Sequence, residues 1–459
     1  MKTKKHYLCQ VLFAFLLIVS FTACKDNDKT QKGEEDLEYV LTKEDVSFPD
    51  TEEKTQSAKI GEPLEIEVTT ISDKDLSFKW YIINEEPSTR SEKTKVSTEK
   101  NLNYAFLDPG TFQLSLEVSQ GSIRFEYPYP AQIEVGFGEI TPPSENATPY
   151  ITKVVEYLPA VGQFTNDLPK YVKGDTQEIM NEKALAYIGG KGKGMISLGG
   201  FGGYVTVGFD HTIENVKGKR DFRVIANAFD AADNPDPNAP LGGSCEPGVI
   251  MVAYDSNKNG EADEWEWFEI SGSAHKDPTK ELWYDKAVKD SNDVRLIPNY
   301  EITYFKPEEE PANPNEPEYI RWEDNQGQKG YKAKNNFHKQ SYYPQWVKED
   351  KLTFKGTRLP QNGVDESGEG SYYVLYKFRY GYADNELNNK DDSAVDIDWA
   401  VDKNGNKVHL PGVDFIKVYT GVDQENGWLG ECSTEITRIE DLHLLGVDID
   451  TRSEEEEEE

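Results

Sequence analysis

The fold is decided between residues 195 and 270. The chain reads MISLGGFGGYVTVGFD over residues 195–210, and two further apolar runs follow, FRVIA at 222–226 and VIMVAY at 249–254. These runs are short, rich in β-branched and aromatic residues, and bounded by Gly, Pro, Asn and Asp, which is typical of β-strands. The stretch therefore predicts several consecutive strands.

The last of these runs leads into DSNKNGEADEWE, residues 255–266, which we call the acidic loop. It has the pattern of a calcium-binding loop, with oxygen-bearing side chains at positions one, three, five, nine and twelve, glycine at position six, and a backbone carbonyl available at position seven. The predicted Ca²⁺ ligands are Asp255, Asn257, Asn259, Glu261, Asp263 and Glu266. Both flanks of the loop read as strands, so the loop would lie within a β-hairpin. The alternative is an acidic hairpin turn at Asn259-Gly260 that binds no metal.

The composition is strongly acidic. The 459 residues include 84 Asp and Glu against 50 Lys and Arg, for a formal net charge of −34. This balance argues against binding to nucleic acid or to anionic lipid head groups, because both are themselves negative. Residues 447–459 end in six glutamates and are predicted to form a solvated acidic tail.

The first residues predict export and lipid anchoring. Residues 1–23 combine early lysines with an apolar segment that is too short to span a membrane comfortably, as in a secretory signal peptide. The segment ends at Cys24 in a pattern that resembles a bacterial lipobox, so Cys24 is the predicted lipidation site. Residues 25–28 (KDND) resemble the charged signal that sends Bacteroidota lipoproteins to the cell surface. The alternative is an ordinary cleaved signal followed by an incidental cysteine.

Four cysteines are present, and two of them remain after Cys9 leaves with the signal peptide and Cys24 carries lipid. The remaining thiols are Cys245 and Cys432. Because an exported protein reaches an oxidising compartment, a disulfide between them is a hypothesis that their wide separation leaves open.

The rest of the chain divides by composition and strand pattern. We expect a polar tether at 24–37, an immunoglobulin-like domain at 38–137 with strands near 63–68, 76–82 and 104–118, a linker at 138–149, and a larger β-domain at 150–446. A capping box at 175–178 predicts one helix, which uses Ile179, Leu185 and Ile188 as apolar contacts and stops at Gly189-Gly190. Later strands are expected near 301–305, 319–322, 372–380, 395–401 and 415–419.

Two resemblances add to this division. Residues 78–82 (FKWYI) and 109–116 (PGTFQLSL) resemble the matching strands of PKD-like domains. The larger domain resembles the C-terminal domain of Bacteroidota cell-surface lipoproteins, on the acidic loop and on the stretches at 159–164 (PAVGQF), 197–203 (SLGGFGG), 221–229, 246–250 (EPGVI), 337–344 (FHKQSYYP), 396–401 (DIDWAV), 414–420 (DFIKVYT) and 427–431 (GWLGE).

The resemblance implies an outer-membrane protein displayed at the cell surface, of a kind that often works beside a TonB-dependent importer. The predicted fold class is all-β, with an Ig/PKD-like β-sandwich followed by a larger jelly-roll-like β-sandwich that carries one short helix.

The sequence gives little sign of catalysis. The five histidines of the mature chain have no zinc-ligand spacing, and no nucleophile elbow, P-loop or kinase signature appears. The richest binding candidate is an aromatic segment among amide and charged residues, which suits a sugar or a flat cofactor such as a corrinoid. Its members are Tyr319, Trp322, Tyr331, Phe337, Tyr342, Tyr343 and Trp346. The alternative is that these rings pack the core beneath a long insertion.

The sequence thus predicts a non-enzymatic surface lipoprotein that binds a glycan or another nutrient through a calcium-stapled β-sandwich. Two other functions stay open at this point: a structural or adhesive surface protein without a small ligand, and a glycan-active hydrolase.

Overall fold

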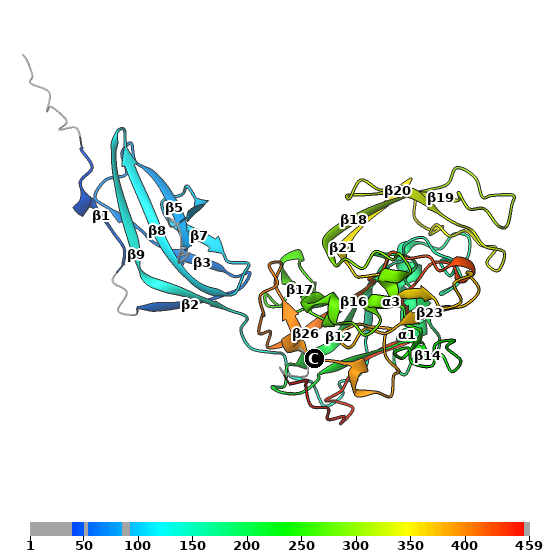
Figure 1. The fold of residues 1–459 in the computed structure, drawn as a ribbon. Coiled ribbons are helices and arrows are strands. Elements are labelled where there is room, and N and C mark those ends of the chain that lie inside the picture. The colour runs from blue at the N-terminus through cyan, green and yellow to red at the C-terminus, as the bar shows by residue number, and fades with distance from the viewer. Residues whose placement is uncertain (1–38, 50–53, 85–91, 454–459) are drawn as a thin grey trace, which may run out of the picture.

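The computed structural model describes residues 39–49, 54–84 and 92–453. The predicted signal peptide, Cys24, the tether and the six terminal glutamates lie outside the described residues. Strands in several sheets make up most of the structure (Figure 1), so the all-β sandwich-type prediction is confirmed.

The N-terminal part is built on a five-stranded sheet with its own hydrophobic core. The sheet runs β2 (Thr55–Lys59), β9 (Ile123–Gly136), β8 (Gly110–Gln120), β5 (Ser77–Asn84), β6 (Glu92–Ser97), and two short pairs lie beside it: β3 (Pro63–Ile66) with β7 (Leu102–Ala105), and β1 (Val46–Ser47) with β4 (Thr69–Thr70). Among the described residues of this part, only β2 and β9 pair in parallel. Trp80, Leu114 and Leu116 are fully buried between the strands. Alternating burial along β3 and β9 is what the period-two pattern of a half-buried strand requires.

The larger part is organised around a six-stranded antiparallel sheet. Its order is β10 (Lys153–Leu158), β12 (Tyr204–Glu214), β26 (Gly412–Thr420), β16 (Gly248–Ala253), β17 (Trp267–Ile270), β25 (Ala400–Val401). The predicted runs at 204–210, 249–254 and 415–419 therefore lie side by side, although the third is distant in sequence. β26 lies inside the sheet between β12 and β16, and its burial pattern is almost continuous, as in a strand whose two faces are both covered.

Smaller sheets surround this one. They are β20 (Lys329–Lys332), β19 (Ile320–Asp324), β18 (Ile297–Phe305), β21 (Lys351–Arg358); β14 (Phe229–Asp230), β15 (Gly242–Ser244), β23 (Tyr373–Tyr376), β22 (Gly363–Asp365); β24 (Ala394–Val395), β13 (Phe222–Ile225), β28 (Arg438–Asp441); and β11 (Ile196–Ser197) with β27 (Glu435–Ile436). The expected strand at 395–401 is interrupted by a 3₁₀ turn at Ile397–Trp399. Asp396 caps this turn by accepting a hydrogen bond from the backbone N–H of Asp398 at 2.8 Å, which competes with strand pairing.

Three helices occur in the described residues, where the sequence predicted one. The predicted helix is α1 (Gln177–Ile188); α2 (Ser273–Lys276) and α3 (Tyr284–Lys289) are too short to show a helical period in the sequence. The cap of α1 is Thr176, one residue later than the predicted box, and it accepts from the backbone N–H of Ile179. Its buried stripe is Met180, Ala184 and Ile188, so Ile179 points outward.

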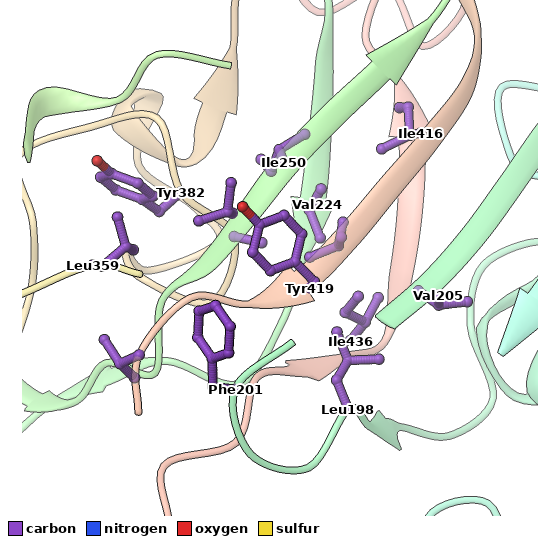
Figure 2. Close-up of a cluster of buried hydrophobic side chains, with 14 of the residues drawn as sticks. Leu198, Phe201, Val205, Val224, Ile250, Leu359, Tyr382, Ile416, Tyr419 and Ile436 are labelled. Atoms are coloured by element: carbon purple, nitrogen blue, oxygen red, sulfur yellow. The ribbon is translucent and has the colours of Figure 1, made fainter. Parts of the chain in front are cut away.

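The glycine run at 199–203 brings Phe201 into the core. A Cβ atom on Gly203 would lie 1.9 Å from the carbonyl oxygen of Leu198, so no larger residue fits there. This close turn places the Phe201 ring edge-on to Tyr300, with centroids 5.0 Å apart, and to Tyr419, with centroids 6.3 Å apart. Figure 2 shows Phe201 beside Tyr419 among the buried aliphatic side chains of this cluster.

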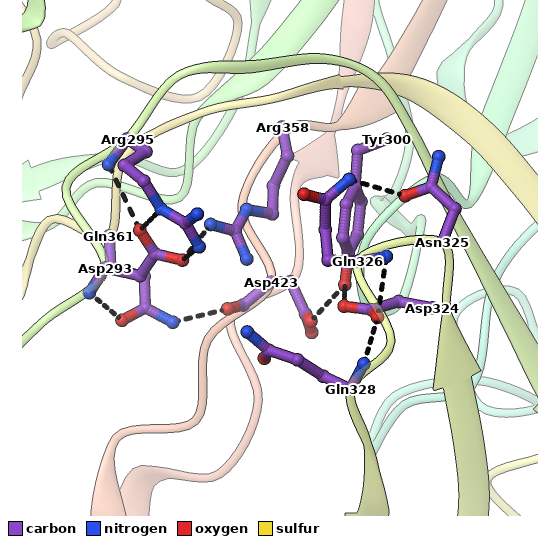
Figure 3. A network of polar contacts seen from close by, with 10 residues as sticks. All are labelled: Asp293, Arg295, Tyr300, Asp324, Asn325, Gln326, Gln328, Arg358, Gln361 and Asp423. Atoms are coloured by element: carbon purple, nitrogen blue, oxygen red, sulfur yellow. Dashed lines mark hydrogen bonds and ion pairs between the residues drawn. The ribbon is translucent and has the colours of Figure 1, made fainter.

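A polar network fixes the β18–β21 sheet to the main body (Figure 3). Arg295 and the buried Arg358 both bind the carboxylate of Asp293. Their positive charges hold the pKa of Asp293 well below its usual range, with the hydrogen bond from Arg295 as the largest cause. At the other end, Tyr300 donates to Asp324 at 3.0 Å and lies 3.3 Å from Asp423. The sheet is thus held by ion pairs as well as by apolar packing.

Candidate functional site

The predicted aromatic segment is mostly core. Tyr319, Tyr342, Tyr343 and Trp346 are each at most 8 % exposed, Trp322 is half-buried, and Tyr331 and Phe337 are exposed. Tyr319 and Tyr342 pack edge to face with centroids 5.4 Å apart, and the indole N–H of Trp346 donates to Gln177 on α1. For the four buried rings, the core-packing alternative describes the structure. Tyr343 also forms part of the wall of a cavity of about 390 Å³, beside Lys306 and Glu310.

The acidic loop is closed by its own side chains. Asp255 accepts from the backbone N–H groups of Asn259 and Gly260 at 3.0 and 2.8 Å. The side-chain amides of Asn257 and Asn259 both donate to Asp263, at 2.7 and 3.0 Å. Gly260 has φ of +81°, the left-handed conformation that favours glycine and that the sharp turn at loop position six needs.

The other end of the acidic loop is buried. Glu266 is 2 % exposed and accepts from the backbone N–H and the hydroxyl of Ser256, at 2.8 and 3.0 Å, and from the backbone N–H of Asp263 at 3.0 Å. Burial raises the pKa of Glu266 above its ordinary value, and these hydrogen bonds oppose the rise. Glu261, whose predicted contribution is its backbone carbonyl, has an exposed side chain.

The acidic loop also touches the N-terminal part. The hydroxyl of Ser256 donates to the carbonyl of Ile60 at 3.3 Å, and the Trp265 ring packs against the N-terminal core. Gly61 lies under this ring with φ of +75°, and a Cβ there would come within 2.3 Å of the indole. Beside this contact, Phe137 packs edge-on to Tyr254, with centroids 6.2 Å apart. The loop therefore forms part of the joint between the two hydrophobic cores.

A second cavity, which we call the large cavity, opens at the edge of the six-stranded sheet. Its volume is about 650 Å³. Strand register places Met251, Glu269 and Val401 side by side across β16, β17 and β25, so these three residues share the sheet face that forms its floor. The walls come from β21, from α2, from the start of β18 and from the hairpin after β25. Besides the three floor residues, the lining includes Trp267 on β17 and Trp399, Ser271, Leu296, Pro298, Asn299, Thr357, Asn404, Lys276, Lys355, Lys403 and Lys407.

Glu269 is the best-connected group in this floor. Its carboxylate accepts from the hydroxyls of Thr357 at 2.7 Å and Tyr419 at 2.9 Å, and a ring nitrogen of His275 lies 2.8 Å away. Burial would raise the pKa of Glu269, but the His275 contact and the two hydroxyl donors outweigh it, so the net pKa lies below the ordinary value. The other ring nitrogen of His275 lies 2.8 Å from the hydroxyl of Tyr382. The result is an ionised carboxylate in a fixed hydrogen-bonded frame.

A third cluster is buried near the two thiols. Glu246, Asp384 and Glu435 have carboxylate oxygens within 4.8 Å of one another, the one such group of three found among the described residues; the acidic loop does not gather its carboxylates that closely. Burial, and then the charge of Glu435, raise the pKa values of Glu246 and Asp384. Protons held within the cluster relieve this repulsion.

Cys245 and Cys432 lie next to this cluster. Cys245 precedes Glu246, which belongs to it, and Cys432 precedes Ser433, whose backbone N–H donates to Glu246 at 3.1 Å. The structure has both as free thiols, each 1 % exposed, so the hypothesised disulfide is not formed in it. Burial raises the pKa of both thiols well above the ordinary value. A neutral, enclosed thiol behaves as a small apolar side chain and reacts slowly.

Sequence reasoning missed both the large cavity and the carboxylate cluster. The members of each come from separate strands, and each stands singly in its own local pattern. One signal is present in the sequence: DKNGN at 402–406 is typical of a hairpin turn, and this turn forms one wall of the large cavity.

Comparison with known proteins adds no relative. No protein-family model matches the chain, and no curated protein matches it at a significant level. Among the described residues, none of the helices is long and apolar enough to cross a membrane.

Proposed function

We propose that this chain is a lipid-anchored protein of the outer-membrane surface that binds a glycan or another nutrient in the large cavity and does not catalyse a reaction. The observation that carries the proposal is a cavity of about 650 Å³ with an indole ring, Trp267, on the sheet that forms its floor. That volume lies within the range of small-ligand sites. Surface display and a neighbouring importer rest on the signal at 1–28 and on the resemblance to Bacteroidota lipoproteins.

The lining suits a sugar. Trp267, Met251 and Leu296 offer apolar surface to the C–H face of a pyranose ring, while Asn299 and Ser271 offer hydrogen bonds to its hydroxyls. A mixture of this kind gives orientation as well as contact area.

The carboxylates of the cavity favour binding over catalysis. Glu269 has three partners inside the protein. Asp402 accepts from the backbone N–H groups of Asn404 and Asn406, at 2.8 and 2.9 Å, and so closes its own turn. A general acid or base needs a group that can exchange a proton with the substrate, and both carboxylates are already engaged.

We also propose that the acidic loop binds Ca²⁺ as a structural staple. Asp255, Asn257 and Asp263 already face the interior of a tight turn, and a hard cation prefers such oxygen ligands. On binding, Asp263 would replace its two hydrogen bonds from the amides of Asn257 and Asn259 by coordination to the ion. Glu266 would likewise replace hydrogen bonds from backbone N–H groups by coordination. The ion would then brace the joint between the two cores.

The binding proposal is tested with a panel of oligosaccharides and a corrinoid, using calorimetry on the purified protein. The informative variant is Trp267→Ala, and Trp428→Ala is the matched control, since Trp428 is 54 % exposed and is not among the residues that line the cavity. We expect a bound ligand to lose most of its affinity in the first variant and none in the second. Equal binding by both variants would place the site elsewhere.

A further inference from the structure

The charge of the large cavity is opposite to that of the chain. Four lysines and two carboxylates line the cavity, whereas the whole chain carries 50 basic against 84 acidic residues. A local reversal of this kind concentrates anions against the repulsion of the rest of the surface. This local excess of positive charge suggests that the cavity receives an anionic ligand.

The two carboxylates of the lining do little to offset the lysines. Glu269 is held by Thr357, Tyr419 and His275 in the floor, and Asp402 by the backbone of its own turn. Hydrogen bonds from these neighbours spread each negative charge into the protein. For Lys355, Lys403 and Lys407, no hydrogen bond or ion pair to a residue in the described part of the chain offsets the positive charge.

Three lysines carry the argument. Lys403 and Lys407 lie on the hairpin that follows β25, and Lys355 lies on β21, so the positive charge comes from two separate walls. All three are exposed, and no ion pair within 4.0 Å joins any of them to a residue in the described part of the chain. Glu301 stands opposite Lys355 across the β18–β21 ladder without such a pair. Their charge is thus available to a ligand.

We infer that the large cavity selects an anionic saccharide, one that carries a carboxylate or a sulfate on its ring; this rests on the proposed function of the same cavity. The sugar ring would stack against Trp267 while its anionic group reaches the ammonium groups of Lys403 and Lys407. Ammonium groups accept either anion because they bind as point charges rather than through a planar fork. A neutral sugar would leave these lysines unused.

The test is calorimetry on the full-length protein in detergent, with three ligands: trigalacturonate, the neutral α-1,4-galactotriose, and a sulfated chondroitin disaccharide. The variant is Lys403→Ala combined with Lys407→Ala. The control is Lys351→Ala, which removes an exposed lysine from the same strand as Lys355 but outside the cavity lining. Circular dichroism and thermal melting confirm that the variants fold.

We expect an acidic ligand to bind about tenfold more tightly than the neutral trisaccharide, as two charge-assisted contacts at a partly exposed site provide. The double variant should abolish this preference, the control should keep it, and added salt should weaken it. Tighter binding of the sulfated than of the carboxylated ligand supports the inference; because the chondroitin disaccharide also carries a uronate carboxylate, comparison with its unsulfated form assigns the anion. Equal binding of neutral and acidic sugars, or an unchanged preference in the double variant, overturns it and leaves the proposed function standing. Failure of all three saccharides to bind overturns the inference, and failure of the whole panel of oligosaccharides and the corrinoid as well overturns the proposed function.

Discussion

The hydrogen-bonded frame around Glu269 predicts that Glu269→Ala destabilises the larger part of the protein. The side chain is 18 % exposed, and its partners Thr357 and Tyr419 are buried. Removing the carboxylate leaves two hydroxyls and one imidazole without an acceptor, beside a cavity too open to repack. A buried donor left unsatisfied costs about 1–3 kcal/mol, and three donors lose their acceptor in this variant.

Because the three contacts share one carboxylate, their costs do not add. We expect a loss of about 3–5 kcal/mol in the free energy of unfolding. At about 2–4 °C per kcal/mol for a domain of this size class, the melting temperature should fall by about 6–20 °C. Glu269→Gln should lose less, since the amide keeps one acceptor. Glu261→Ala, on the exposed side of the acidic loop, is the control and should change little.

Urea denaturation at several pH values measures the change in the free energy of unfolding and shows whether it depends on the ionised carboxylate of Glu269. The pKa of Glu269 is lower in the folded protein than the ordinary 4.5 of a glutamate. Its stabilising contribution is therefore complete above that value and is lost as the pH falls through the folded pKa. The difference between wild type and Glu269→Gln should shrink below about pH 4.5. A change under about 1 kcal/mol for Glu269→Ala at pH 7 would mean that cavity water replaces the carboxylate, and the reasoning would fail.

Three further predictions concern calcium, the two thiols and the location of the protein. Calcium at about a hundred times its dissociation constant should stabilise the protein by about 2.7 kcal/mol, with an affinity on the order of 10⁻⁴–10⁻³ M; Asp255→Ala should abolish the shift, and identical melting curves in chelator and in calcium would refute the site. Alkylation followed by peptide mapping should leave Cys245 and Cys432 unlabelled in the native protein and label both after denaturation without reductant, whereas a recovered disulfide-linked peptide would contradict the free thiols of the structure. Protease added to intact cells should remove the protein, and Cys24→Ala should prevent anchoring; full protection of the wild type would rule out surface display.

Several strands could be predicted because their cause is local, whereas others, among them β9 and β21, were not predicted. Alternating burial along 63–68 and the β-branched run at 249–254 specify strands whatever they pair with. The glycine of the acidic loop was likewise predictable, because the loop pattern requires a left-handed residue at position six. The helix cap was misplaced by one residue because Asp175 and Thr176 can both serve as a cap, and Asp175 instead accepts from the backbone N–H of Val172 and pairs with Lys183.

The site could not be predicted in the same way, because its causes are distant in sequence. The aromatic segment at 319–346 looked like a binding surface, but aromatic density does not distinguish a sugar platform from a core. Glu269 and Lys355 read as ordinary polar positions on strands, and only the pairing of β17 with β25 and the packing of β21 over Tyr419 bring them to one cavity. A periodic pattern within one strand does not reveal which residues of distant strands meet at one cavity.

The acidic loop and the large cavity share one short strand, and this connects the two proposals physically. Glu266 ends the loop, and Trp267, the cavity's indole, is the next residue and the first of the four in β17. The backbone of β17 is fixed on one side by β16 and on the other by only two residues of β25. Its start depends on Glu266 and on the packing of Trp265 over Gly61 in the N-terminal part. Whatever holds the loop therefore also sets the position of the ring on which a sugar would stack. A bound calcium ion and a bound ligand would thus act on the same few residues as the contact with the N-terminal part.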